Sequence, residues 1–193
     1  MKLLTTLDSF SGSLFSYVCH QDSSILVDIQ GKTLMLCPRC TGLQAGFFAS
    51  VLILFLISDR KSLKAGRAFK WLVVGALVFL FSEWMLAQLG IIHSGTASRF
   101  LSGLAGGVAL SLLAFAYRNQ FAGRGSRSRS QFYQLFSMIV ISLLLGLLLF
   151  QSDLWIVVTL FLAVAVVTNV LFVLQTAILR VYSLLVKPKN KTL

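Results

Sequence analysis

The residues most able to do chemistry lie in one short segment of the chain. All three cysteines and one of the two histidines fall between residues 19 and 40, and they are Cys19, His20, Cys37 and Cys40. Thiolate sulfur and imidazole nitrogen are preferred zinc ligands, and zinc usually takes four, so this set predicts a site for zinc or another transition metal. The sequence Cys37-Pro38-Arg39-Cys40 resembles a zinc knuckle, in which a tight turn points two sulfurs at one ion.

The sequence leaves the fourth ligand and the role of the thiols open. His20 directly follows Cys19, and adjacent residues bind one ion only with an awkward backbone, so His93 or Glu83 is an alternative ligand. A thiol-disulfide oxidoreductase is a second interpretation, because a C-x-x-C pair outside the cytoplasm meets an oxidising compartment. A permanent structural disulfide is a third. Covalent haem attachment is not expected, since Thr41 stands where that motif has histidine.

A second group of candidates is polar and lies in or beside apolar runs of the chain. Glu83 falls inside one such run, where an ionised carboxylate is costly unless it is paired or hydrated. Gln88, His93 and Arg99 follow it, and together the four residues predict a polar pocket beneath the cysteines. Such a pocket would serve a transporter or a lipid-handling protein. The structural alternative is an ion pair between Glu83 and Arg99 that only joins two helices.

The elements that position these residues are expected to be membrane-spanning helices. The chain is 57% hydrophobic and 12% charged, with a mean hydropathy of +0.86, whereas soluble domains carry about 25% charged residues. A helix that crosses the bilayer needs about 20 mostly apolar residues. Five runs qualify: Thr41–Ser58, Trp71–Leu89, Phe100–Tyr117, Phe132–Phe150 and Leu154–Leu179. The fold class expected is therefore an all-α bundle of about five spans, the last two joined as a tight hairpin through residues 151–153.

Charge in the loops predicts the orientation of these spans. The loops after spans one and three and the tail after span five, which all lie on one side, hold 13 of the 17 lysines and arginines. Only Lys2, Lys32, Arg39 and Arg99 fall on the opposite side. Because short cytoplasmic loops accumulate basic residues, we expect the N-terminus outside and the C-terminus in the cytoplasm of a cell membrane. This places the cysteines, Glu83 and Arg99 at the same, extracytoplasmic side.

The segment before the first span is expected to form an extracytoplasmic cap. Apolar residues between Met1 and Val18 recur every three or four positions, as in a helix lying in the membrane interface. Ile25–Ile29 and Thr33–Leu36 read as two short strands joined by residues 30–32, a hairpin that returns Cys37 toward Cys19. The expected organisation is thus a cap over residues 1–40, a bundle over 41–180 and a basic tail over 181–193.

Small residues predict how two of the spans pack. Gly42 and Gly46 lie four apart near the outer end of the first span, and Gly103 and Gly107 do so in the third. Such spacing lets helix backbones approach closely in lipid. The packing would bring the first turn of span one near Arg99.

Composition also limits the partners. The net charge of +11 suggests nucleic acid at first, but the basic residues flank apolar spans and are explained by topology, so no nucleic-acid partner is expected. The expected partner is the lipid bilayer, and a homo-oligomer and a small-molecule substrate stay open. No phosphate-binding glycine loop, nucleophile elbow or zinc-protease helix motif occurs, which leaves enzymatic activity undecided.

Two patches of residues resemble DUF2085, a family of predicted bacterial and archaeal membrane proteins with no assigned function. The first patch is Cys19-His20-Gln21 followed by Cys37-Pro38-Arg39-Cys40-Thr41-Gly42, and the second is Glu83 and Gln88 followed by Ser98-Arg99, Gly103 and Gly107. The resemblance covers about half of the chain. It implies a membrane topology and a site location, and no activity.

Overall fold

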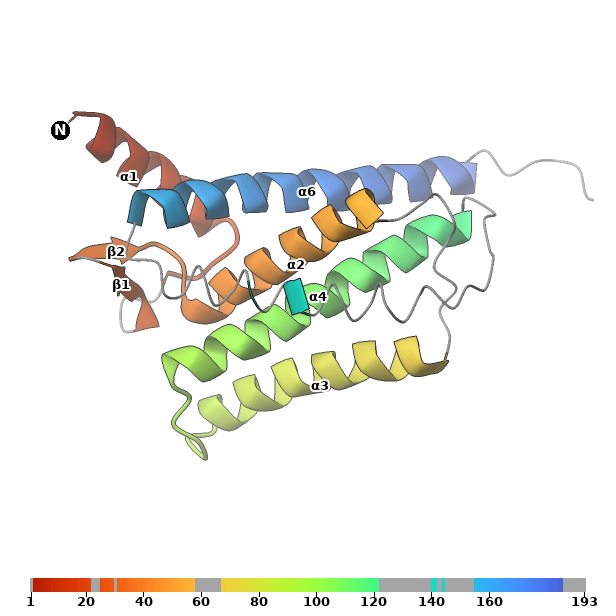
Figure 1. The fold of residues 1–193 in the computed structure, drawn as a ribbon, viewed down its shortest axis with the longest axis horizontal. Helices are drawn as coiled ribbons and strands as arrows, with labels where there is room; N and C mark the ends of the chain where they lie inside the picture. The colour runs from red at the N-terminus through yellow and green to blue at the C-terminus, as the bar shows by residue number, and fades with distance from the viewer. Residues whose placement is uncertain are drawn as a thin grey trace, which may run out of the picture.

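The computed structural model is an elongated bundle of helices with a small cap at one end (Figure 1). The structure describes residues 2–21, 25–29, 31–57, 67–121, 140–141, 144 and 155–185. Its elements in chain order are α1 (Lys2–Ser16), β1 (Val27–Ile29), β2 (Lys32–Leu34), α2 (Pro38–Ile57), α3 (Arg67–Gln88), α4 (Thr96–Phe121) and α6 (Trp155–Leu185). We call the end that carries β1 and β2 the hairpin end.

Four of the described helices are long and apolar enough to cross a membrane. The candidate spans within them are Pro38–Phe55, Lys70–Gln88, Thr96–Tyr117 and Trp155–Tyr182. Helices α2, α4 and α6 start at the hairpin end and run in the same direction, whereas α3 runs back toward that end (Figure 1). The helical membrane fold is thus confirmed. Apart from residues 140–141 and 144, the expected span Phe132–Phe150 lies outside the described residues, as does the connection through residues 151–153.

Helices α2 and α4 pack through their glycines, as their spacing predicts. A Cβ atom added to Gly42 would lie 2.8 Å from the backbone nitrogen of Leu104, and one added to Gly107 would lie 2.8 Å from that of Phe47. Real Cβ atoms do not approach backbone this closely, so a larger residue at either position would force the helices apart. One consequence is that Gly103 lies against the backbone of Arg39, in the first turn of α2.

A matched pair of glycine substitutions tests this packing. Gly107→Ala is expected to destabilise the protein by about 1–3 kcal/mol, because the added methyl group meets a helix backbone that cannot move aside. Gly75 in α3 has no atom within 4 Å of its added Cβ, so Gly75→Ala should stabilise by about 0.5–1 kcal/mol through its helix propensity. The measurement is unfolding in detergent micelles, and equal effects of the two variants would contradict the close α2–α4 contact.

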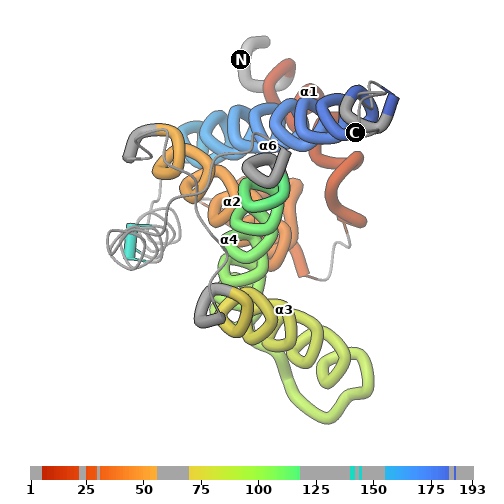
Figure 2. Tube along the Cα trace, turned by 90° about the vertical axis from the view of Figure 1, so that its right-hand side faces the viewer, coloured from red at the N-terminus to blue at the C-terminus, as the bar shows by residue number. Residues whose placement is uncertain are grey.

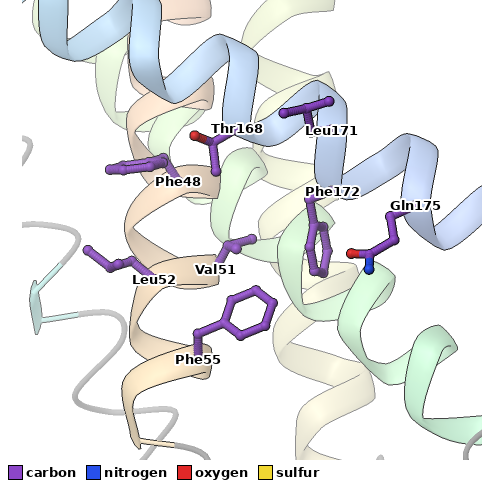
Figure 3. A pocket seen from close by; sticks show the side chains of 8 residues that line it. All are labelled: Phe48, Val51, Leu52, Phe55, Thr168, Leu171, Phe172 and Gln175. Carbon is purple, nitrogen blue, oxygen red and sulfur yellow. The ribbon is translucent and has the colours of Figure 1, made fainter.

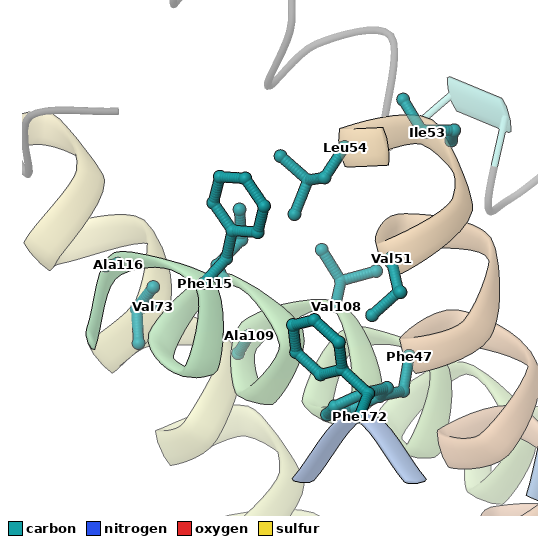
Figure 4. Close-up of a cluster of buried hydrophobic side chains, with 11 residues drawn as sticks. Phe47, Val51, Ile53, Leu54, Val73, Val108, Ala109, Phe115, Ala116 and Phe172 are labelled. Carbon is teal, nitrogen blue, oxygen red and sulfur yellow. The ribbon is translucent and has the colours of Figure 1, made fainter. Parts of the chain in front are cut away.

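The bundle is built as a row, with the α2–α4 pair between α6 and α3 (Figure 2). Buried side chains of α2, α3, α4 and α6 form its main apolar core, which includes Phe47, Val73, Val108, Phe115 and Phe172 (Figure 4). Helix α3 packs on α4 at the edge, and many of its large apolar side chains are exposed, as expected for a helix that faces lipid.

The cap packs on the start of α6. Strands β1 and β2 pair antiparallel, with Val27 opposite Leu34, through a turn in which Gly31 has a φ of +73°. Both strands are shorter than expected. A second apolar cluster joins the cap to α6, and its buried members are Phe15, Cys19, Leu34, Leu36, Cys37, Val158, Leu162 and Val166. The Nζ atom of Lys32 also lies 4.4 Å from the centre of the Trp155 ring. The cap is therefore docked on the bundle, and it holds the cysteines at the hairpin end.

Candidate functional site

The three cysteines converge at the junction of the cap and the bundle. Cys19 follows the last turn of α1, while Cys37 and Cys40 lie at the start of α2. Their three sulfur atoms all lie within 4.8 Å of one another, and no two of them form a disulfide. In a tetrahedral zinc site with a Zn–S distance of about 2.3 Å, two sulfurs lie about 3.8 Å apart. The cluster therefore fits a metal ion if the sulfurs move together by up to about 1 Å.

Local helix chemistry fixes Cys37 and Cys40. Helix α2 starts at Pro38, the first helical position, where the missing N–H of proline costs nothing. Cys37 is then the N-cap, and the backbone N–H of Cys40 donates to the sulfur of Cys37 at 3.4 Å. An N-cap side chain that accepts a hydrogen bond from the third helical residue satisfies one of the backbone N–H groups that have no partner within the helix. The knuckle is thus also a helix start.

Hydrogen bonds also join the two halves of the cluster. The backbone N–H of Cys37 donates to the sulfur of Cys19 at 3.4 Å. The neighbouring Cys37 and Cys40 thiols stabilise the thiolate form of Cys19, which lowers the pKa of Cys19 well below that of a free thiol. The same interaction raises the pKa of Cys37, because it stabilises the thiol form of that residue. Cys19 is therefore the first of the two to lose its proton.

Gln21 holds the Cys19 segment against the Cys37 segment. Its side-chain Nε2 donates to the carbonyl of Gly12 in α1 at 2.9 Å and to that of Met35 after β2 at 3.2 Å. Its φ of +54° is unusual for a residue other than glycine, so the surrounding contacts must hold the backbone there. Sequence reasoning gave Gln21 no role beyond its place in the Cys-His-Gln motif.

The histidines do not join the three sulfurs. The side chain of His20 is exposed, and its ring does not belong to the group of metal-binding side chains that the three cysteines form. His93 lies in the loop before α4, and its side chain is exposed as well. Among the described residues, the only group of three or more metal-binding side chains is the cysteine cluster.

Glu83 is the centre of a separate polar cluster between α2, α3 and α4. Its side chain is 5% exposed. It forms an ion pair with Arg39, whose Nε also donates to Oε2 at 3.1 Å. Ser102 in α4 donates to the same oxygen at 3.1 Å, and Ser94 donates to Oε1. The ion pair expected between Glu83 and Arg99 is therefore wrong, since Arg39 takes that place.

The other expected pocket residues surround this cluster without entering it. Gln88 and His93 have exposed side chains, and Arg99 is partly buried in the first turn of α4. The Nε of Arg99 is buried and has no hydrogen-bond partner. Of the four residues proposed for a polar pocket, only Glu83 is fully buried.

A third polar contact joins α2 to α6 inside the bundle. The side-chain nitrogen of Asn169 donates to the carbonyl of Gln44 at 3.1 Å and to its Oε1 at 2.7 Å. Both residues are at most 9% exposed. Because lipid offers polar groups no partner, side chains that bond to each other across two helices stabilise the helix pair.

An apolar cavity of about 430 Å³ also lies between α2 and α6 (Figure 3). Its walls are Phe48, Val51, Leu52, Phe55, Thr168, Leu171, Phe172 and Gln175. None of the cysteines and no member of the Glu83 cluster lines it. It is therefore a feature of the membrane interior and separate from both polar clusters.

The fold and the site define a multi-pass helical membrane protein with a thiol cluster at one end of its bundle. Residues 19–113 match the family described as "Predicted membrane protein (DUF2085)", the family that the motifs of this segment resemble. An uncharacterized protein of Methanothermobacter thermautotrophicus is 29% identical over 99 residues, a match that covers 51% of this chain and 86% of the relative. No solved structure matches the chain. The matched segment contains the three cysteines, Arg39, Glu83 and Arg99, and it excludes α1 and α6.

Proposed function

We propose that this protein binds one transition-metal ion, zinc in the first instance, through the thiolates of Cys19, Cys37 and Cys40. The observation that carries the proposal is the convergence of three free sulfurs within 4.8 Å of one another, from segments far apart in the sequence. Thiolates favour zinc and other soft ions, and the N–H groups of Cys37 and Cys40 stabilise the negative charge on the sulfurs. Metal binding at this junction would fasten α1 and the hairpin to the start of α2.

We place the metal site on the extracytoplasmic side of a cell membrane. In the full sequence, 13 of the 17 lysines and arginines lie between spans one and two, between spans three and four, or after the last span. This excess supports a cytoplasmic position for the end of the bundle opposite the hairpin. The thiols then face the oxidising compartment, where bound metal would protect them from forming disulfides.

For the fourth ligand we propose His20, with His93 as the alternative. His20 follows Cys19 directly and its side chain is solvent-accessible, so rotation of the ring costs no buried contact. His93 lies on a different loop, between α3 and α4, whereas His20 lies in the same segment as Cys19.

The test is the metal content of the detergent-purified protein, measured by mass spectrometry for the natural chain, His20→Ala and His93→Ala. We expect about one zinc ion per chain in the natural protein. His20→Ala should weaken binding by about tenfold to a hundredfold, the range that loss of supporting groups around a metal produces, and His93→Ala should not. A folded chain that binds no metal would exclude this function. The reverse order of the two histidine variants would instead assign the nitrogen ligand to His93.

A thiol-disulfide oxidoreductase is the second candidate, and the low pKa of Cys19 is the observation that favours it. A thiolate is the form of cysteine that attacks a disulfide, and the sulfurs of Cys37 and Cys40 are its immediate neighbours. Alkylation of the metal-free protein before and after mild reduction separates the two functions. Thiols that cycle between blocked and reactive forms, with no bound metal, favour the oxidoreductase.

A further inference from the structure

We propose that Arg99 binds a phosphate group at the hairpin end of the bundle, in a site distinct from the metal site. This inference does not depend on the cysteines. It rests on the hydrogen bonding and charges of Arg39, Glu83 and Arg99.

The first observation is that Arg99 has no partner among the described residues. Its Nε is buried and makes no hydrogen bond, and no acid pairs with its side chain. A buried guanidinium N–H loses hydration that only a hydrogen-bond acceptor can replace, and leaving it without an acceptor costs free energy. The missing acceptor is then expected from a bound ligand.

The second observation is that Glu83 cannot be that acceptor. Its oxygens already accept from Arg39, Ser94 and Ser102. Arg39 matches its single negative charge. The Arg39–Glu83 ion pair is therefore neutral, and Arg99, which takes no part in it, keeps an unbalanced positive charge.

The third observation places Arg99 over the same junction as Arg39. Ser102 and Gly103 follow Arg99 by three and four residues, so the three share a face of α4. Ser102 contacts the carboxylate that Arg39 binds, and Gly103 lies against the Arg39 backbone. The Arg99 side chain thus belongs to the face of α4 that meets α2, at the membrane-surface end of its span.

The chemistry of this position favours a phosphate. The planar guanidinium presents parallel N–H groups that match two phosphate oxygens, and the positive end of α4 lies in the same turn. At the end of a membrane span a phosphate comes either from a phospholipid headgroup or from a soluble phosphate compound. Both sources offer the same group to Arg99.

Binding is tested on the purified full chain with two probes, inorganic phosphate and short-chain phosphatidylglycerol. The variants are Arg99→Gln, Arg99→Lys and Lys32→Gln, the last as a control that removes a positive charge elsewhere at the hairpin end. Affinity is measured from the rise in melting temperature as the concentration of each probe increases. A second readout, made on the natural chain, is protection of Arg99 from phenylglyoxal, an arginine-specific reagent, located by peptide mass spectrometry.

We expect saturable binding of at least one probe, weakened about tenfold or more by Arg99→Gln, less by Arg99→Lys, and not by Lys32→Gln. Binding of inorganic phosphate would assign a soluble ligand, and binding of the lipid alone would assign a headgroup. Equal affinity in the natural chain and Arg99→Gln overturns the proposal. If Arg99→Gln does not fold, reaction of Arg99 with phenylglyoxal at the same rate with and without both probes overturns it as well.

Discussion

Replacing Cys37 with serine is expected to reduce bound metal from about one ion per chain to near zero, while α2 still starts at Pro38. Serine removes a thiolate ligand, and the two remaining sulfurs give too few donors for tight binding. Yet serine is itself a favourable N-cap, so its hydroxyl is able to accept the N–H that Cys40 now donates to sulfur. The metal should be lost without loss of the fold.

Cys37→Ala separates the two roles of this residue. It removes both the ligand and the cap, so it should bind as little metal as the serine variant and be about 1 kcal/mol less stable. At Cys40, serine and alanine should differ less, since Cys40 caps no helix. Metal content and unfolding in detergent are measured for all four variants. Full metal content in Cys37→Ser would contradict the assigned ligand set.

The sequence was sufficient to predict the helical membrane fold and the convergence of the three cysteines. Long uncharged runs leave few structures other than spanning helices, because an unpaired backbone is too costly in lipid. The turn around Gly31 brings β2 back beside β1, and this short path returns Cys37 to Cys19. Glycines four apart identified the α2–α4 contact for the same reason: only small residues allow it.

The roles of Gln21 and Arg39 could not be predicted. Gln21 acts through two backbone carbonyls, one in α1 and one after β2, and no residue type marks such an acceptor in a sequence. The sequence marks Arg39 as part of the C-x-x-C knuckle and as one of four basic residues on the outer side, and neither feature identifies its partner. Its pairing with Glu83 depends on how α3 is placed at the edge of α4, which hydropathy does not determine. Arg99 is the alternative partner of Glu83 in the sequence because both residues are expected at a similar depth in the membrane. Depth alone does not show toward which neighbouring helix each side chain points.

Glu83→Gln is the second variant with a large expected effect, on stability and not on metal content. The amide keeps the size of the side chain but removes the charge, which leaves Arg39 unpaired at the junction of α2 and α3. Loss of one member of a buried ion pair costs about 3–5 kcal/mol. Because the Arg39 side chain is 20% exposed, solvent screens its charge, and we expect a cost below that range, about 2–3 kcal/mol.

A double-mutant cycle with Arg39→Gln isolates the pair from the other contacts of each residue. The loss of stability in the double variant should be smaller than the sum of the losses in the two single variants, by about 1–3 kcal/mol. The reason is that the double variant removes both charges together. Asp28→Asn is the matched control: it also converts an acid to its amide, but at an exposed strand position, and should change stability by less than about 0.5 kcal/mol.

Metal content distinguishes this cluster from the cysteine site. The sulfurs are held by backbone N–H groups of the α2 start, and none of these bonds involves the Arg39 side chain. Glu83→Gln should therefore retain about one metal ion per chain at temperatures where it is folded. If the variant instead lost its metal but kept its stability, the carboxylate would act on the thiol site, and the ion pair would not be what holds α3 to the head of α2.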